Sequence, residues 1–585
     1  MVQDPNIYAD WSHARLVERV VELDRQLQQY NEKLTLDQTP NIQSLNEVAT
    51  KTALSSDPRS AIPRSLKAAK VQKKSRDIDP SKYTTRFIAL KFAYLGKRYN
   101  GYEHANNNIT ELPTIEEELW KALRKTRLIF PKNMDTLEEL GGSESRASRT
   151  YNIDWEDCQY SKCGRTDRGV SAFGQVIGIK VRSSKPKPKN DELATTLGSV
   201  SGAVEMNENP PTNGLNAPET KEIADQWDDI ADELPYVKIL NGALPEDIRI
   251  LAWCPRPPAD FSARFSCRER RYRYFFTQPA FCPSPLAGTE SVRNNKKLRE
   301  GWLDLDAMQE AANHYVGSHD FRNFCKVDTS KQITNFVRRI SRAEIEMVNP
   351  SDIPLGFLNK AGFEQFAGIP NDRTKQNNID NVYSFTVHGN AFLWHQIRHM
   401  VAILFLVGQG LERPSIIPEL LDANKNPRRP VYEIASDTPL VLWDCVFGDE
   451  GDDLGWVYAG DPRTSSRPGK SSDRFGQGSI VENVWSLWKR RKIDEILAGT
   501  LLDIVASRED TKPVAQNESS EPIQPRARIP RIFCGGDTGK PVGKYIPLLK
   551  RKMLDTVEEQ NARYLSAKGN KREKRSSGEK ANNSE

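Results

Sequence analysis

Asp167 stands between two arginines in a segment rich in turn-forming residues. The run from Lys162 to Val176 reads KCGRTDRGVSAFGQV, so Arg165 and Arg168 flank the carboxylate and Gly169 follows. Because an opposite charge within a few ångströms favours the ionised form, we expect the pKa of Asp167 to be low. A charged carboxylate can act as a nucleophile or as a base. An aspartate beside a glycine is also common turn chemistry, and the motif alone leaves that structural alternative open.

Two further segments predict a helix and a strand. Thr114 and Glu117 form a capping box ahead of an apolar helical pattern, which indicates that a helix starts there. Residues 261–276 read FSARFSCRERRYRYFF, and Tyr272 and Tyr274 alternate with arginines in them. Because successive side chains of a strand point to opposite faces, the two tyrosines share one face. That face could belong to the core or could contact a substrate.

A third segment predicts a long apolar helix with one arginine inside it. Residues 390–400 read NAFLWHQIRHM, and the apolar pattern continues to Val407 before Gly408 stops it. Arg398 lies within this pattern. Since a buried arginine is stable only when it is paired, we expect Arg398 to have a partner.

Taken in this order, these segments resemble those of the TruA-type family of tRNA pseudouridine synthases. The resemblance implies that Asp167 is the catalytic aspartate and that Arg165 lies beside it. It also implies that Tyr272 is the tyrosine of the family's R-Y-x-Y strand, and that Arg398 is the basic residue that pairs with the aspartate. Arg168 departs from the family pattern, since many members have alanine there, and it adds a charge near the nucleotide.

Several details resemble the eukaryotic branch of this family, which modifies positions 38 and 39 of the tRNA anticodon arm. They are Lys162-Cys163, residues 173–175, 323–326 and 402–410, and a leading heptad helix. The resemblance implies an α+β fold in which two pseudo-symmetric RRM-like or ferredoxin-like halves join into one curved sheet platform with a central cleft. It further implies that the partner is tRNA, bound through its anticodon arm, and that the chain forms a homodimer.

The predicted elements repeat one order, strand, helix, strand, strand, which suits two α+β halves. The first set is the strand 86–95, the helix from residue 115 and the strands 175–181 and 247–253; the second is the strand 271–276, the helix 307–316 capped by Asp306 and Gln309, and the strands 338–347 and 383–387.

Composition along the chain predicts its organisation. A helix over 481–497 is expected to offer Trp485, Leu487 and Trp488 for packing. The predicted parts are an N-terminal heptad helix (1–35), a flexible linker (36–83), a first catalytic half (84–260, with insertions at 131–156 and 183–234), a second half (261–449, with an insertion at 349–379), a C-terminal extension with loose segments (450–561) and a basic disordered tail (562–585).

The net charge of +5 does not by itself indicate a polyanionic partner, so RNA affinity must come from clustered cations. Many members of any such cluster are ordinary solvated charges. The candidate RNA contacts are Lys91, Lys97, Arg98, Arg264, Arg268, Arg270, Arg271, Lys326, Arg338 and Arg339, and the resemblance adds Arg165, Arg168, Asn390 and His395 as substrate-binding residues.

Cysteine and histidine spacing predicts neither a metal nor a cofactor. The eight cysteines include no C-x-x-C pair. His395 and His399 are four residues apart, a spacing that can bind a metal, but no third ligand is evident. The chain begins without an apolar signal region and contains no stretch of membrane-spanning length, so we expect it in the nucleus and cytoplasm and not in a membrane.

The implied reaction breaks the bond from uracil N1 to the sugar, turns the base and bonds C5 to the sugar. Asp167 would act either as a nucleophile on the sugar carbon or as a base that forms a glycal, and the sequence does not choose. Arg398 would hold it ionised through a guanidinium fork, and Tyr272 would stack on the uracil. The target base must be flipped, and Arg165 could fill the vacated place. A non-catalytic tRNA chaperone and a related synthase for other tRNA positions or other RNAs are the alternatives.

Overall fold

The computed structural model describes eleven parts of the chain: residues 22, 79–131, 152–187, 227–283, 291–293, 296–298, 300–348, 381–448, 454–464, 474–506 and 531–582. The chain divides into two compact units, residues 1–78 and 79–585. The heptad helix and almost all of the linker predicted for the first unit lie outside the described residues. So do most of the three predicted insertions.

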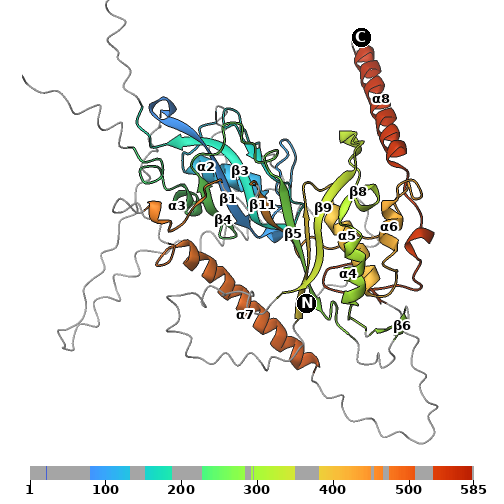
Figure 1. The fold of residues 1–585 in the computed structure, drawn as a ribbon. Coiled ribbons are helices and arrows are strands. Elements are labelled where there is room, and N and C mark those ends of the chain that lie inside the picture. Colours follow the sequence, from blue (N-terminus) through green and yellow to red (C-terminus); the bar gives the residue numbers. More distant parts are fainter. Residues whose placement is uncertain are drawn as a thin grey trace, which may run out of the picture. The chain divides into compact units, whose positions relative to one another are not determined.

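The second unit is built on one mixed sheet of ten strands (Figure 1). Its order is β12-β4-β1-β3-β11-β5-β10-β9-β8, and β2 pairs with β3 at the side. The strands are β1 (Thr84–Tyr94), β2 (Ser161–Lys162), β3 (Ser171–Ser183), β4 (Ile248–Cys254), β5 (Glu269–Gln278), β8 (Gly317–Asp320), β9 (Val337–Met347), β10 (Asn381–Gly389), β11 (Leu440–Val446) and β12 (Val457–Tyr458). Two short hairpins lie apart from this sheet, β6 (Ser291–Arg293) with β7 (Lys296–Leu298) and β13 (Arg531–Ile532) with β14 (Lys540–Pro541).

Helices in the described residues are α2 (Ile115–Lys125), α3 (Tyr236–Asn241), α4 (Leu305–Asn313), α5 (Gln396–Gly408), α6 (Ile416–Leu421), α7 (Ile480–Ala506) and α8 (Val557–Asn582). The cap predicted for α2 is confirmed, because the Thr114 hydroxyl accepts a hydrogen bond from the Glu117 backbone N–H at 3.2 Å. From Met400 onward α5 is apolar, and nearly every residue of the helix is buried, as expected of a helix that packs inside the protein. It packs on α4, which in turn packs on β9.

β11 joins the two parts of the sheet, and the sequence pattern did not predict it. It runs parallel to β3, with Leu442 opposite Ala172, and antiparallel to β5, with Leu442 opposite Tyr272. β3 directly follows the turn that contains Asp167. One short strand therefore brings the predicted catalytic turn and the predicted catalytic tyrosine to neighbouring places in the sheet.

Several predicted boundaries were wrong. α4 is capped by Asp304, whose side chain accepts from the Ala307 backbone N–H, and not by Asp306. α5 begins at Gln396 instead of Asn390, because His395 has a left-handed backbone with φ 60°. A residue in that conformation interrupts the helical hydrogen-bond ladder.

The segments predicted to be loose are partly ordered. Glu233, from the acidic end of the second predicted insertion, is buried and forms an ion pair with Arg86 at 2.9 Å. Residues 454–464 contribute β12 to the main sheet, and the predicted disordered tail continues α8 as far as Asn582.

α7 confirms the predicted helix, but it does not pack as expected, since none of its residues is buried. Trp485 is 36% exposed. Among the described residues, no helix is long and apolar enough to cross a membrane.

Candidate active site

Asp167 lies in a tight turn between β2 and β3 that is held from three sides. The Thr166 carbonyl accepts from the Tyr102 backbone N–H at 3.0 Å, and the Thr166 hydroxyl is 2.7 Å from the Tyr94 hydroxyl. Within the turn, the Val170 backbone N–H donates to the Asp167 carbonyl at 3.2 Å. Gly169 has φ 80°, a conformation that L side chains rarely adopt. The sequence therefore fixes the backbone that carries the carboxylate.

The Asp167 side chain is 26% exposed, and His395 Nε2 lies 3.5 Å from its Oδ2. Burial raises the pKa of Asp167 to about 6, against the lowering effects of Arg398 and of a hydrogen-bonding contact from the Trp394 side chain. Asp437 acts in the same direction as burial. The prediction of a low pKa was therefore wrong, because desolvation outweighs the nearby cation.

The two arginines that flank Asp167 in sequence are directed to other carboxylates. Arg165 forms an ion pair with Glu103 at 3.1 Å, and Arg168 lies 3.7 Å from Glu111. Both arginines are well exposed, at 46% and 62% of their side chains. Because both arginine side chains reach carboxylates other than Asp167, they do not hold the Asp167 pKa down.

Arg398 lies in the first turn of α5 and holds the loop before β11. Its Nε donates to the Ala435 carbonyl at 2.7 Å, and one terminal nitrogen lies 3.7 Å from Asp437 Oδ2. Between the described side chains of Asp167 and Arg398 no ion pair within 4.0 Å is formed, so the predicted guanidinium fork was wrong. Arg398 nevertheless lies close enough to lower the Asp167 pKa through space. It is thus shared between two carboxylates.

Asp437 also lies against the turn that contains Asp167. A Cβ added at Gly169 would come within 2.6 Å of Asp437 Oδ1, so only glycine fits there without displacing this carboxylate. The turn, Asp437 and Arg398 therefore form one assembly. Sequence reasoning missed Asp437, because nothing in its local pattern distinguishes it from an ordinary loop aspartate.

His395 caps α5 and faces Asp167. Burial, Arg398 and Lys326 lower its pKa to about 4, so it is neutral near pH 7. A neutral imidazole can donate one hydrogen bond, and at 3.5 Å the Asp167 carboxylate is within loose reach of Nε2. The structure places this predicted substrate-binding residue beside the carboxylate itself.

Tyr272 lies on β5, two strands away from β3, and is 9% exposed. Its ring packs edge-on against Phe392 with centroids 5.2 Å apart, and burial raises its pKa well above the ordinary value. Within the part of the chain that the structure describes, its hydroxyl makes no hydrogen bond. A neutral tyrosine with a free hydroxyl is compatible with contact to an entering base, and equally with a core position.

Trp394 and Lys326 form a surface beside Asp167 whose aromatic member was not predicted. The Trp394 side chain is 42% exposed, and Lys326 Nζ lies 4.3 Å from its ring centroid. The Lys326 backbone N–H also donates to the Trp394 carbonyl at 2.9 Å. An exposed indole next to a cation is suited to stack on a nucleobase. The signal was present in the motif, where Trp394 directly precedes His395.

Lys91, Arg270 and Arg271, which were predicted as RNA contacts, have protein partners. Lys91 is 12% exposed and pairs with Asp444 at 2.9 Å. Arg270 donates to the backbone carbonyls of Cys163, Arg264 and Asn390 at 3.0, 2.9 and 2.6 Å. Asn390, itself a predicted substrate-binding residue, thus contacts Arg270 through its backbone. Arg271 pairs with Glu269 at 2.8 Å. These contacts leave the three cations little freedom to bind phosphate.

Other candidates are more exposed. Arg98 is 66% exposed, although it lies 3.5 Å from Asp247. Arg264 is exposed and lies 5.2 Å from the ring of Phe265, which is itself 81% exposed. Arg268 is exposed as well.

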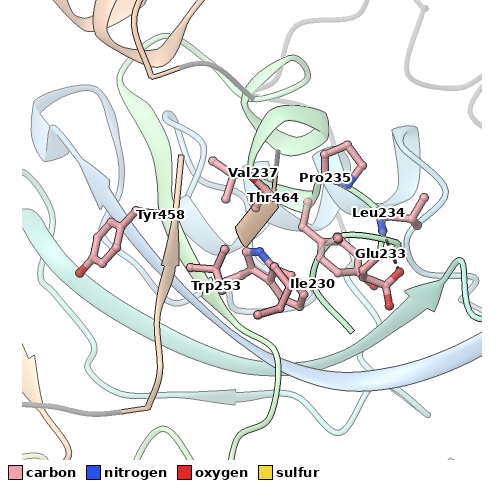
Figure 2. A pocket seen from close by; sticks show the side chains of 11 residues that line it. Ile230, Glu233, Leu234, Pro235, Val237, Trp253, Tyr458 and Thr464 are labelled. Carbon is pink, nitrogen blue, oxygen red and sulfur yellow. Dashed lines mark hydrogen bonds between the residues drawn. The ribbon is translucent and has the colours of Figure 1, made fainter. Parts of the chain in front are cut away.

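A separate small pocket lies at the β4–β12 edge of the sheet (Figure 2). Trp253, Glu233 and Tyr458 are among its lining residues, and none of the residues described above as part of the site contributes to it. We therefore place the functional site at Asp167 and not in this pocket.

The turn that carries the partly buried Asp167 carboxylate lies beside the start of α5, which contains Arg398, and beside the exposed Trp394 ring. A carboxylate, a cation and an exposed aromatic ring together are suited to an enzyme that acts on a nucleic acid. A family model described as tRNA pseudouridine synthase matches residues 311–448. The tRNA pseudouridine(38/39) synthase of Saccharomyces cerevisiae is 32% identical over 567 residues, which cover 97% of this chain and 93% of that protein.

The proteins of the same name from mouse and human are each 38% identical, over 386 and 389 residues. These alignments cover 66% of this chain and 60% of each relative, so the chain spans less than two thirds of the mammalian proteins. The chain belongs to the tRNA pseudouridine synthase family.

Proposed function

We propose that this protein isomerises uridine to pseudouridine in the anticodon arm of tRNA, at positions 38 and 39. The observation that carries the proposal is the position of Asp167, partly buried on a rigid turn, with His395 at 3.5 Å and Arg398 within electrostatic reach. The choice of positions is supported by the names of the yeast, mouse and human relatives.

The reaction needs neither an oxidant nor a reductant. The N1–C1′ bond breaks and its electron pair leaves with the uracil, the base turns, C5 bonds to C1′, and C5 then loses its proton. Asp167 either bonds to C1′ and is later displaced by C5, or takes the C2′ proton to give a glycal and returns it afterwards. With a pKa of about 6 it is mostly ionised near neutral pH, as both routes require.

The neighbouring residues have separate roles in this proposal. Neutral His395 orients the carboxylate, and Arg398 stabilises its charge while it fixes the 435–437 loop. Tyr272 contacts the flipped uracil. Trp394 supplies a stacking surface at the entrance.

RNA binding is proposed to use the exposed cations around this site. Arg165 and Arg168, on the turn, are placed to contact the phosphates next to the flipped nucleotide, and Arg98, Arg264 and Arg268 extend the basic surface.

Three further properties complete the proposal. The two parts of the sheet on either side of β11 are taken as pseudo-symmetric halves, because each contains strands and a helix in the same predicted order. The protein is proposed to act as a homodimer and to work in the nucleus and cytoplasm. Light scattering at several salt concentrations tests the dimer, and imaging of the tagged full chain tests the location.

The activity is tested with tRNA that carries 5-tritiated uridine, because forming pseudouridine releases the tritium to water. Wild type and an Asp422→Ala control, which alters a half-buried acid outside the proposed site, are expected to release label at equal rates. Asp167→Ala is expected to bind tRNA and release none. Label release by Asp167→Ala at the wild-type rate contradicts the mechanism.

Sequencing of the product RNA tests the positions, with pseudouridine expected at 38 and 39. Wild type that remodels tRNA without releasing any label would indicate the chaperone alternative. Modification confined to other positions would indicate a related synthase.

A further inference from the structure

Three cysteines far apart in sequence meet close to one another, and one of them, Cys163, lies four residues before Asp167. The Sγ atoms of Cys163, Cys267 and Cys445 all lie within 4.8 Å of one another, and the three residues are 4%, 7% and 2% exposed. Cys163 follows β2, Cys267 precedes β5, and Cys445 lies on β11. The fold therefore assembles a buried thiol triangle from three segments that sequence spacing could not connect.

The geometry of this triangle is close to that of a metal site. Zinc–sulfur bonds are about 2.3 Å long, and around a tetrahedral ion they place sulfurs about 3.8 Å apart. Sulfurs already within 4.8 Å of one another need to move inward by about 1 Å or less to meet one ion. Thiolate sulfur prefers soft or borderline cations such as zinc and copper(I) over magnesium or calcium.

Charge balance distinguishes between these two cations. Arg270 lies beside the triangle, where its guanidinium donates to the Cys163 carbonyl at 3.0 Å and reaches two other carbonyls. It forms no ion pair with any carboxylate among the residues described. Three metal-bound thiolates carry three negative charges, which a divalent ion and one arginine neutralise. Copper(I) would leave one negative charge uncompensated in a buried site, and such a charge is costly.

We propose that Cys163, Cys267 and Cys445 bind one zinc ion as three thiolates, with water or a small ligand in the fourth position. Binding releases the three thiol protons to solvent, and no redox step is involved. The site would tie together the backbone four residues before Asp167, the approach to the β5 strand that carries Tyr272, and β11. Its role is to position the two parts of the active site relative to each other.

The full chain, purified without a histidine tag from zinc-supplemented medium and washed with a mild chelator, tests the proposal by elemental analysis. About one zinc per chain is expected, falling to background in Cys267→Ser and in Cys445→Ser. Cys282→Ser is the matched control, because Cys282 is exposed and lies outside the triangle, and it should keep its zinc. Wild type with no more zinc than the triangle variants, or equal loss in the control, overturns the proposal.

Cobalt substitution keeps the test decisive if the serine variants do not fold. Wild type loaded with Co²⁺ should show the near-ultraviolet absorption of thiolate-to-cobalt charge transfer, with an intensity appropriate to three thiolates. Absence of this band means that the cysteines only fill the core. The readout does not depend on tritium release, so failure of the zinc site and failure of the proposed activity can be told apart.

Discussion

Replacing Asp167 by asparagine is expected to stabilise the protein while it abolishes turnover. Folding favours the protonated form of Asp167, because its pKa rises from an ordinary value of 3.8 to about 6. Its contribution to stability is therefore greatest below pH 3.8 and is lost as the pH rises through about 6. The difference is about two pH units, which corresponds to about 3 kcal/mol of destabilisation once the carboxylate is ionised in both states.

The pH dependence separates this charge effect from packing changes. The same two pKa values give a cost of about 1–2 kcal/mol at pH 5 and about 3 kcal/mol at pH 8. Asp167→Asn removes this cost, so its stability advantage over wild type should grow by about 1–2 kcal/mol between pH 5 and pH 8. Urea unfolding of both proteins at the two pH values measures it.

A control with the opposite sign is available in the same chain. Hydrogen bonds from Lys425 lower the pKa of Asp422, whose carboxylate therefore favours folding above its unfolded pKa. Asp422→Asn should accordingly bring no gain in stability at pH 8. The reasoning about Asp167 is refuted if the advantage of Asp167→Asn is the same at both pH values, or if it shrinks as the pH rises.

Three other predictions concern turnover and binding. Arg398→Ala should lower kcat by about 10²-fold or more. It should also move the acidic limb of the pH–rate profile upward from about pH 6, since Arg398 lowers the Asp167 pKa. Arg398→Lys should restore part of both effects, and an unchanged profile contradicts the proposed electrostatic role. Asp437→Asn should move the same acidic limb to lower pH, because this carboxylate raises the Asp167 pKa. Single-turnover rates measured across pH test this, and a limb that moves to higher pH contradicts it. Trp394→Ala should weaken tRNA binding by about 5- to 150-fold, from about 1–3 kcal/mol per stacked base, while Trp485→Ala on α7 should leave the Kd measured by filter binding unchanged.

Local patterns predicted the elements well where one physical signal dominated. The alternation around Tyr272 gave a strand, and Thr114 gave a helix start, because side-chain periodicity and caps act over a few residues. β11 was missed because it is short and takes its place from pairing with β3 and β5, which are distant in sequence. α5 begins later than predicted because His395 has a left-handed backbone, and the local apolar pattern gives no sign of that conformation.

The motifs named Asp167, His395 and Arg398, which the structure brings close together, but they did not predict Asp437 or how the charges pair. Sequence placed Arg165 and Arg168 next to Asp167, yet both side chains reach Glu103 and Glu111 across the turn. The cysteine triangle shows the same limitation, since Cys163 and Cys445 are 282 positions apart (445 minus 163) and no spacing rule joins them. Adjacency in sequence fixes the backbone of this turn, whereas the fold decides which charges meet.

The arrangement around Asp167 suits the proposed reaction better than the direct ion pair that sequence predicted. A guanidinium fork would hold the pKa well below its ordinary value and would make the carboxylate a weak base and a poor nucleophile. Burial and Asp437 push the pKa upward, while Arg398, occupied by Ala435 and Asp437, pulls it down only through space. At a pKa of about 6, about nine-tenths of the molecules carry the charged form at pH 7. The carboxylate is thus close to the strongest base that can still be ionised at that pH, and this compromise requires Arg398 to be engaged elsewhere.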